Sequence, residues 1–127
     1  MTIGKLVNKY HAGIHVFVRL IAGLMFFMHG FGKLANGFSL SLMGVAGVVE
    51  SLVGIALLLG FFTRLAALGG AITMVVAYVK VHLAQGFNPL ANGGELALLY
   101  LFIFLGFMVH GAGSWSLEKK LLKKEKF

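Results

Sequence analysis

Cysteine is absent from this chain of 127 residues, which excludes disulfide exchange, metal sites built on thiolates and catalysis by paired thiols. Proline occurs once and charged residues make up only 12% of the chain, whereas hydrophobic residues make up 59% and the mean hydropathy is +0.93. This composition is typical of membrane proteins and lies outside the range of soluble globular domains. Any redox chemistry would therefore depend on a bound molecule that carries the electrons.

Four long apolar stretches occupy most of the chain. A helix needs roughly 20 apolar residues to cross a hydrocarbon core of about 30 Å. The predicted spans cover residues 14–35, 43–62, 65–85 and 94–113. With their short connections they nearly exhaust the sequence, so we predict an all-α membrane protein with a single domain, residues 1–127, folded as a four-transmembrane-helix bundle.

The positions of lysine and arginine predict the orientation of the bundle, because cytoplasmic flanks of membrane helices collect positive charge. Lys5 and Lys9 precede the first span, Arg64 lies between the second and third, and five lysines follow the fourth. Both termini are therefore expected on the cytoplasmic side. We further expect the basic amphipathic tail, residues 116–127, to lie on an anionic inner leaflet, so the partner of this charge is the lipid bilayer and no nucleic acid.

Each span carries one stripe of polar and small residues, which predicts the face that it turns into the bundle. In the second span Gly44, Gly47, Ser51 and Gly54 share a stripe and Glu50 lies at its edge. Small residues mark close helix contacts in membranes, so Glu50 is expected to point inward. Arg19 and Glu50 are 31 positions apart, as are Arg64 and Glu95, which favours an arrangement of two tandem hairpins.

The polar residues of the spans predict a pocket in the outer half of the bundle. We expect Glu50 and Glu95 to handle protons there. The candidate ligand-binding residues are Arg19, His29, Lys33, Tyr78 and His82. Carboxylates, histidines and an aromatic ring around an apolar cavity would suit the headgroup of a quinone, which offers two carbonyl oxygens.

Other interpretations of the same residues stay open. Glu50 and Arg19 could form a structural ion pair between the first two helices, and Glu95 could simply favour the N-terminus of its helix. Haem is the weaker cofactor candidate: it would need facing histidine pairs, His29 with His82 or His15 with His110. No tight spacing of His and Glu indicates a metal site, so none is predicted.

Several segments together resemble the DoxX family of small four-helix membrane proteins. They are Arg19-Leu-Ile-Ala-Gly-Leu, His29-Gly-Phe-Gly-Lys33, Glu50 followed by Gly54, Leu57-Leu-Leu-Gly60-Phe-Phe-Thr-Arg64, Glu95 with residues 98–100, and Gly111-Ala-Gly-Ser-Trp-Ser-Leu117. The resemblance implies a link to quinone-dependent respiration, to subunits of thiosulfate:quinone oxidoreductase or quinol oxidase, and to resistance against quinones and oxidative stress.

The resemblance and the residues lead to one principal hypothesis. The chain would be a multi-pass protein of the prokaryotic cytoplasmic membrane that binds a quinone or a similar lipophilic redox molecule, as a subunit of a quinone-linked oxidoreductase or an oxidative-stress system. It would work with soluble or membrane redox partner subunits, or as a homo-oligomer, and an enzymatic activity of its own stays open. The first alternative is a non-catalytic membrane scaffold or assembly factor, and the second is a small-molecule transporter.

Overall fold

The computed structural model describes residues 1–125, and the helices predicted for the bundle are confirmed. The four long helical segments are α2 (His11–Leu34), α3 (Leu42–Leu59), α4 (Thr63–Ala77) and α5 (Glu95–His110). The short helices α1 (Ile3–Asn8) and α6 (Leu117–Leu122) flank them. Beyond α4 the chain continues as a π-helical turn, Tyr78–His82, and a 3₁₀ turn, Leu83–Gln85. The described part of the chain is thus an all-α membrane protein.

The helices differ in how well they match a bilayer. α2, α3 and the continuous segment Thr63–Gln85 are each long and apolar enough to cross a membrane. α5 has 16 residues, which gives about 24 Å at 1.5 Å per residue, somewhat less than the hydrocarbon core. Helix α5 ends before residue 113, the predicted limit of the span. Gly111 has a positive φ of 73°, and this backbone conformation ends the helix.

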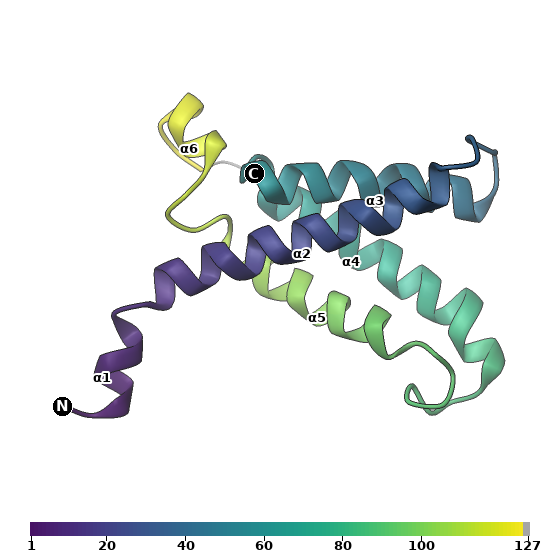
Figure 1. Cartoon of the computed structure of the whole chain (residues 1–127), viewed down its shortest axis with the longest axis horizontal. Coiled ribbons are helices and arrows are strands. Elements are labelled where there is room, and N and C mark those ends of the chain that lie inside the picture. The colour runs from purple at the N-terminus through teal and green to yellow at the C-terminus, as the bar shows by residue number, and fades with distance from the viewer. Residues whose placement is uncertain (126–127) are drawn as a thin grey trace.

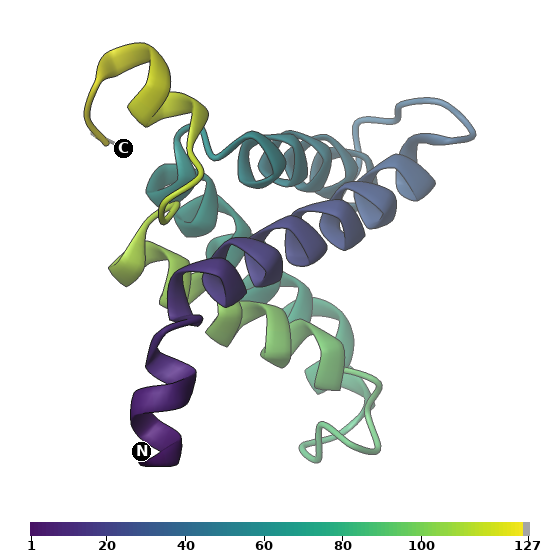
Figure 2. The ribbon, with the colours of Figure 1, turned by 60° about the vertical axis from the view of Figure 1, so that its left-hand side comes forward.

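The chain folds as two antiparallel hairpins (Figures 1 and 2). α2 packs mainly on α3 and α4 mainly on α5, while α3 and α4 join the two hairpins. The predicted tandem arrangement therefore agrees with the packing. At one end lie the start of α2, the turn between α3 and α4, and the end of α5; we call this the basic end, since Arg64 and Lys119 lie there. The other end, with the loops 35–41 and 86–94, is called the loop end.

Glycines set the distance between α2 and α3. A Cβ added to Gly30 would lie 2.5 Å from the amide nitrogen of Ser51 and 2.7 Å from the carbonyl oxygen of Gly47. A Cβ on Gly54 would lie 2.5 Å from the amide nitrogen of Phe27. The two backbones are therefore nearly in contact, as the stripe of small residues in the second span predicted. In a bilayer such close packing supplies much of the attraction between helices.

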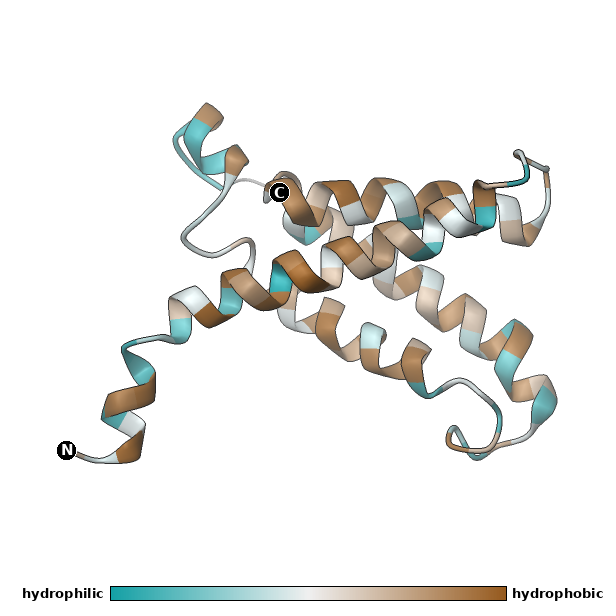
Figure 3. Ribbon diagram, in the orientation of Figure 1, coloured by the Kyte–Doolittle hydropathy of each residue, from teal (hydrophilic) through white to brown (hydrophobic). Residues whose placement is uncertain are grey.

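Aromatic rings fill the space between α2 and α5. The ring of Phe26 lies 4.8 Å from that of Phe104 and 5.2 Å from that of Tyr100, and the latter two rings are stacked at 5.8 Å. All three side chains are buried. Many large aliphatic and aromatic residues are also exposed, and hydrophobic residues recur along the long helices (Figure 3). An exterior of this kind suits contact with lipid tails rather than with water.

Replacing Gly30 by alanine should destabilise the α2–α3 pair. The new methyl group would press on backbone atoms of α3, so we expect Gly30→Ala to lower the free energy of unfolding by about 1–3 kcal/mol. Gly32→Ala is the matched control, because nothing lies within 4 Å of its added Cβ. It should be neutral or slightly stabilising. The measurement is unfolding in detergent followed by circular dichroism, and equal effects of the two variants would contradict the packing argument.

Candidate functional site

A cavity of about 690 Å³ lies between α3 and α4 toward the loop end. Aliphatic residues of both helices form most of its wall, among them Val45, Val49, Ile72 and Val76. Three ionisable side chains also line it, and all three belong to the predicted site: Lys33, Glu50 and His82. They come from α2, from α3 and from the π-helical turn, so the fold brings together residues that are far apart in the sequence.

Glu50 is the buried charge of this cavity. Its side chain is almost fully enclosed, with 1% of the residue exposed, and Oε1 accepts a hydrogen bond from Lys33 Nζ at 2.5 Å. The other carboxylate oxygen, Oε2, has no hydrogen-bond partner among the described residues. A buried carboxylate oxygen without a donor is costly, and Oε2 is enclosed by the protein itself rather than open to the cavity.

The expected ion pair between Glu50 and Arg19 is wrong, because Arg19 lies in the other half of α2. Lys33, which does pair with Glu50, follows Arg19 by 14 residues, or about 21 Å of helix. The Arg19 side chain is buried at the basic end, where Nη1 donates hydrogen bonds to the carbonyl oxygens of Ala112 and Trp115. Arg19 therefore holds the segment after α5 and does not reach the cavity.

His82 enters the cavity from the π-helical turn. Such turns widen the helix by one residue and are frequent at functional sites. His82 Nδ1 lies 3.2 Å from the backbone oxygen of Asn92, in the loop before α5. This hydrogen bond fixes the imidazole ring between the loop and the cavity. Residues 65–85 are predicted as one regular span, and nothing in their sequence indicates the π-helical turn.

Asn92 organises the loop at this end, and sequence reasoning missed it. Its side chain is buried; Nδ2 donates to the Gly86 oxygen at 2.9 Å and to the Tyr78 hydroxyl at 3.3 Å, and Oδ1 accepts from the Gly94 amide at 2.8 Å. Tyr78 is thus tied to the loop and is not among the residues that line the cavity. The signal in the sequence was Asn92-Gly-Gly, a pattern typical of turns.

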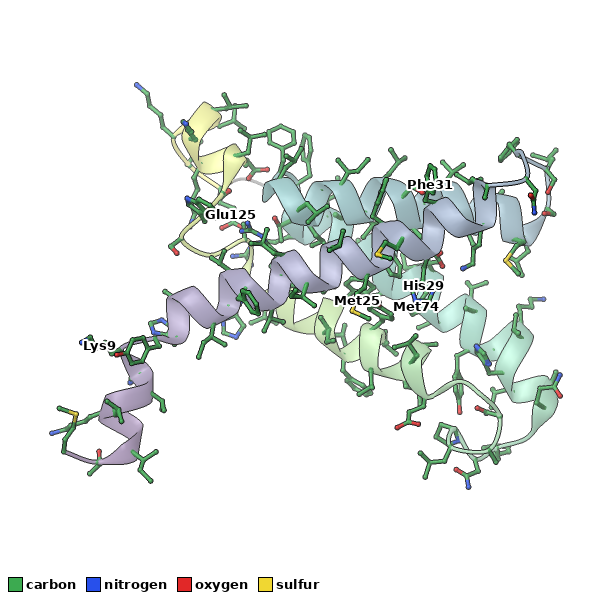
Figure 4. All side chains as sticks on the ribbon, viewed as in Figure 1. Lys9, Met25, His29, Phe31, Met74 and Glu125 are labelled. Carbon is green, nitrogen blue, oxygen red and sulfur yellow. The ribbon has the colours of Figure 1, made fainter. Side chains whose placement is uncertain are left out.

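Two further candidates lie outside the cavity. Glu95 is exposed at the first position of α5, where a carboxylate favours the helix N-terminus. His29 is exposed on α2, and its ring meets that of Tyr100 edge-on at 6.1 Å; Figure 4 shows it projecting from α2 toward the second hairpin. At the basic end, His15 bonds to the Gly111 oxygen at 2.8 Å and lies 5.8 Å from the His110 ring.

The basic end is closed by hydrogen bonds between the tail and the turn that joins α3 to α4. Ser116 Oγ donates to the Gly60 oxygen at 2.7 Å, and the buried Glu118 carboxylate accepts from the Phe62 amide at 3.1 Å. The beginning of the tail is thus anchored to the bundle, and the expectation that residues 116–127 lie on the inner leaflet stays a prediction. Residues 126 and 127 of that prediction lie outside the described residues.

Arg64 connects the tail to the end of α5. Its Nη1 donates to the carbonyl oxygens of Met108 and Val109 at 2.8 and 2.9 Å. These hydrogen bonds give a partner to two carbonyl groups in the last turn of the helix, where backbone carbonyls have no acceptor role within the helix itself. The Nε atom of Arg64 lies 3.7 Å from Glu125, which is labelled in Figure 4. Within residues 1–125 no group of three or more metal-binding side chains comes together. The cavity is therefore the place where ionisable groups and open space coincide.

The chain is similar to bacterial membrane proteins. The DoxX family profile matches residues 14–83. An uncharacterized protein of Haemophilus influenzae is 40% identical over 132 aligned positions, which cover 93% of this chain and 98% of that protein. An uncharacterized membrane protein of Mycobacterium tuberculosis is 31% identical over 133 positions, which cover 84% of this chain and 80% of the relative. No solved structure matches the chain.

A double-mutant cycle should separate the partners of Glu50. Glu50→Gln combined with Lys33→Met should give a coupling energy of about 0.5–3 kcal/mol, because the two side chains are in contact. Glu50→Gln combined with Arg19→Met should be additive to within about 0.5 kcal/mol, because these residues share no partner. The free energy of unfolding in mixed detergent micelles is the measurement. Strong coupling of Glu50 to Arg19 would contradict the structure.

Proposed function

This chain belongs to the DoxX family of membrane proteins, and we propose that it binds a quinone, or a lipophilic redox molecule of similar shape, in the cavity between α3 and α4. One observation carries the proposal: the cavity combines aliphatic walls with the buried pair of Lys33 and Glu50 and with His82. Small-molecule sites typically occupy about 300–1,000 Å³ and place a few polar groups in a largely apolar wall. The cavity has this composition and size.

The position of the cavity suits a ligand that arrives from the bilayer. Met43, Val45, Ile72 and Val81 line it, and each of these residues is also exposed. These side chains are apolar and would contact lipid. A molecule with a hydrophobic tail could therefore enter sideways, without passing either polar end of the protein.

The charges of the cavity favour a neutral ligand. The ammonium group of Lys33 and the carboxylate of Glu50 compensate each other at 2.5 Å, so the pair attracts neither a free anion nor a free cation strongly. A quinone headgroup is uncharged and accepts hydrogen bonds, which Lys33 can donate. Its tail would pack against the aliphatic wall. This chemistry distinguishes the proposal from a carrier of small ions.

In the cell the protein would act as the membrane subunit of a quinone-linked oxidoreductase or an oxidative-stress system of the bacterial cytoplasmic membrane. Because the chain has no cysteine, electrons would reach the ligand from a partner subunit or a soluble donor. The scaffold alternative draws support from the hydrogen bonds at the basic end, which lock the tail onto the helices. Under that alternative the cavity would have no ligand.

A larger side chain in the cavity should block binding. Val76 lines the cavity, whereas the neighbouring Val75 is exposed on the outer face and does not. We expect Val76→Phe to weaken the binding of a short-tailed benzoquinone at least tenfold and Val75→Phe to leave it unchanged. Calorimetric titration of the detergent-purified protein measures both. No binding by the unaltered protein, in detergent and again in lipid nanodiscs, would contradict the proposed function and favour the scaffold.

A further inference from the structure

Resting on the proposed function, we infer that Glu50 makes the cavity selective for uncharged ligands. It cancels the charge of Lys33 from inside the protein and does not touch the ligand, so it determines specificity through its partner. The ligands that it would exclude are anionic amphiphiles such as fatty acids, which share the bilayer with a quinone and could enter the cavity by the same lateral route. In this role Glu50 would not exchange protons with the ligand, contrary to our expectation from the sequence.

The carboxylate of Glu50 is enclosed by the protein. The residue belongs to the wall of the cavity, yet only 1% of it is exposed. Oε1 accepts the hydrogen bond from Lys33, and Oε2 is buried. The charge of the carboxylate therefore acts on a ligand in the cavity at a distance, without a hydrogen bond between them.

Lys33 is the more accessible partner of the pair. Its side chain is 28% exposed, against 2% for the side chain of Glu50, and it also lines the cavity. Nζ lies 2.5 Å from Glu50 Oε1. Two opposite charges this close largely cancel at the distance of a ligand, because their Coulomb energies have opposite signs and similar size. The pair therefore gives the wall of the cavity almost no net charge.

Glu50 is the only acidic side chain among the described residues that line the cavity. The two other ionisable side chains of the wall, Lys33 and His82, are basic. Without Glu50 the wall would hold an ammonium group with no counter-charge, and the low local dielectric would strengthen its attraction for an anion. The choice between anionic and uncharged ligands therefore depends on this one carboxylate.

The packing of α2 on α3 keeps the ammonium group at the carboxylate. A Cβ added to Gly47 would lie 3.0 Å from the Cβ of Lys33, so the base of the lysine side chain lies against α3. Gly47 precedes Glu50 by three residues, or about one turn of the helix. From this position the lysine side chain extends along α3 to the carboxylate. Glu50 thus fixes the position of Nζ and also compensates its charge.

Desolvation makes the neutral wall selective. An anionic headgroup that enters the cavity loses its water and needs an opposite charge or hydrogen-bond donors in return. The compensated ammonium group supplies little of this. An uncharged headgroup, such as that of a quinone, loses less hydration, and both kinds of ligand gain the same contacts with the aliphatic wall. The cavity therefore separates ligands by the charge of their headgroups.

Binding of three eight-carbon ligands tests the inference. Octanol, octanoate and octylammonium share a chain and differ in the charge of the headgroup. Each is titrated calorimetrically into the unaltered protein, Glu50→Gln and the double variant Glu50→Gln/Lys33→Met in a nonionic detergent. The pH is 8, where carboxylates and alkylammonium groups are charged and imidazoles are ordinarily neutral. The quantity compared is the ratio of octanoate to octanol affinity, in which partitioning into micelles cancels between the proteins.

Glu50→Gln keeps the size of the side chain and leaves the ammonium group of Lys33 without a counter-charge. We expect the ratio to rise at least tenfold, the effect of one uncompensated charge a few ångströms from the headgroup at an effective dielectric constant of about 20. The double variant removes that ammonium group and should return the ratio to within about threefold of the unaltered protein. A loss of packing alone would lower both affinities and leave the ratio as it is. An unchanged ratio in Glu50→Gln would overturn the inference.

Two further measurements keep the result decisive if Glu50→Gln does not fold. Glu50→Leu is also uncharged at this position and should raise the ratio in the same way. In the unaltered protein octanoate and octylammonium should bind with affinities within about threefold of each other, because the ion pair is neutral. A preference for octanoate of about tenfold or more would show that Lys33 is not compensated, and it would overturn the inference without any variant.

The benzoquinone titration on the same preparations separates the inference from the proposed function. Binding of benzoquinone together with an unchanged ratio in Glu50→Gln would contradict the inference alone. A raised ratio without binding of benzoquinone would support the inference and contradict the proposed function.

Discussion

The structure depends on one electrostatic constraint: a carboxylate buried between membrane helices has to be compensated. Glu50 lies in the middle of α3, a helix long and apolar enough to cross a membrane, and Lys33 at the end of α2 is the group that neutralises it. The pair forms because glycines bring α2 and α3 almost into backbone contact, which leaves Lys33 within reach. Charge compensation and helix packing are therefore two aspects of the same contact.

The two ends of the bundle differ in structure: hydrogen bonds close the basic end, and a cavity lies toward the loop end. At the basic end, the side chains of Arg19, Ser116 and Glu118 form hydrogen bonds to the backbone, and they close the structure. At the loop end, α3 and α4 enclose a cavity, and the buried Glu50 in its wall keeps an unsatisfied oxygen. Polar side chains thus anchor the tail at one end, and ionisable side chains line the cavity at the other.

The sequence predicted the helices and the inward face of Glu50, because helix length and a stripe of small residues are local properties of the chain. It could not predict the partner of Arg19. A stripe of polar residues shows which face of a helix points into the bundle, but it does not show which group of another segment lies opposite a given residue. The partners of Arg19 are backbone carbonyl oxygens of the segment after α5. The burial of Glu118 could not be predicted either, because this residue belongs to a lysine-rich tail. Its carboxylate accepts a hydrogen bond from the amide of Phe62, which is 56 positions away in the sequence. Three of the seven candidate residues meet at the cavity, which only tertiary structure could decide.

The π-helical turn at Tyr78–His82 has a consequence for how this site can change in evolution. Such a turn contains one residue more than the regular helix requires. Because the turn absorbs that extra residue, deleting one residue there would restore regular helical geometry, while the part of α4 that packs on α3 and α5 precedes the turn. A lineage could therefore alter the histidine side of the cavity by a single-codon insertion or deletion within the turn, without rebuilding the bundle.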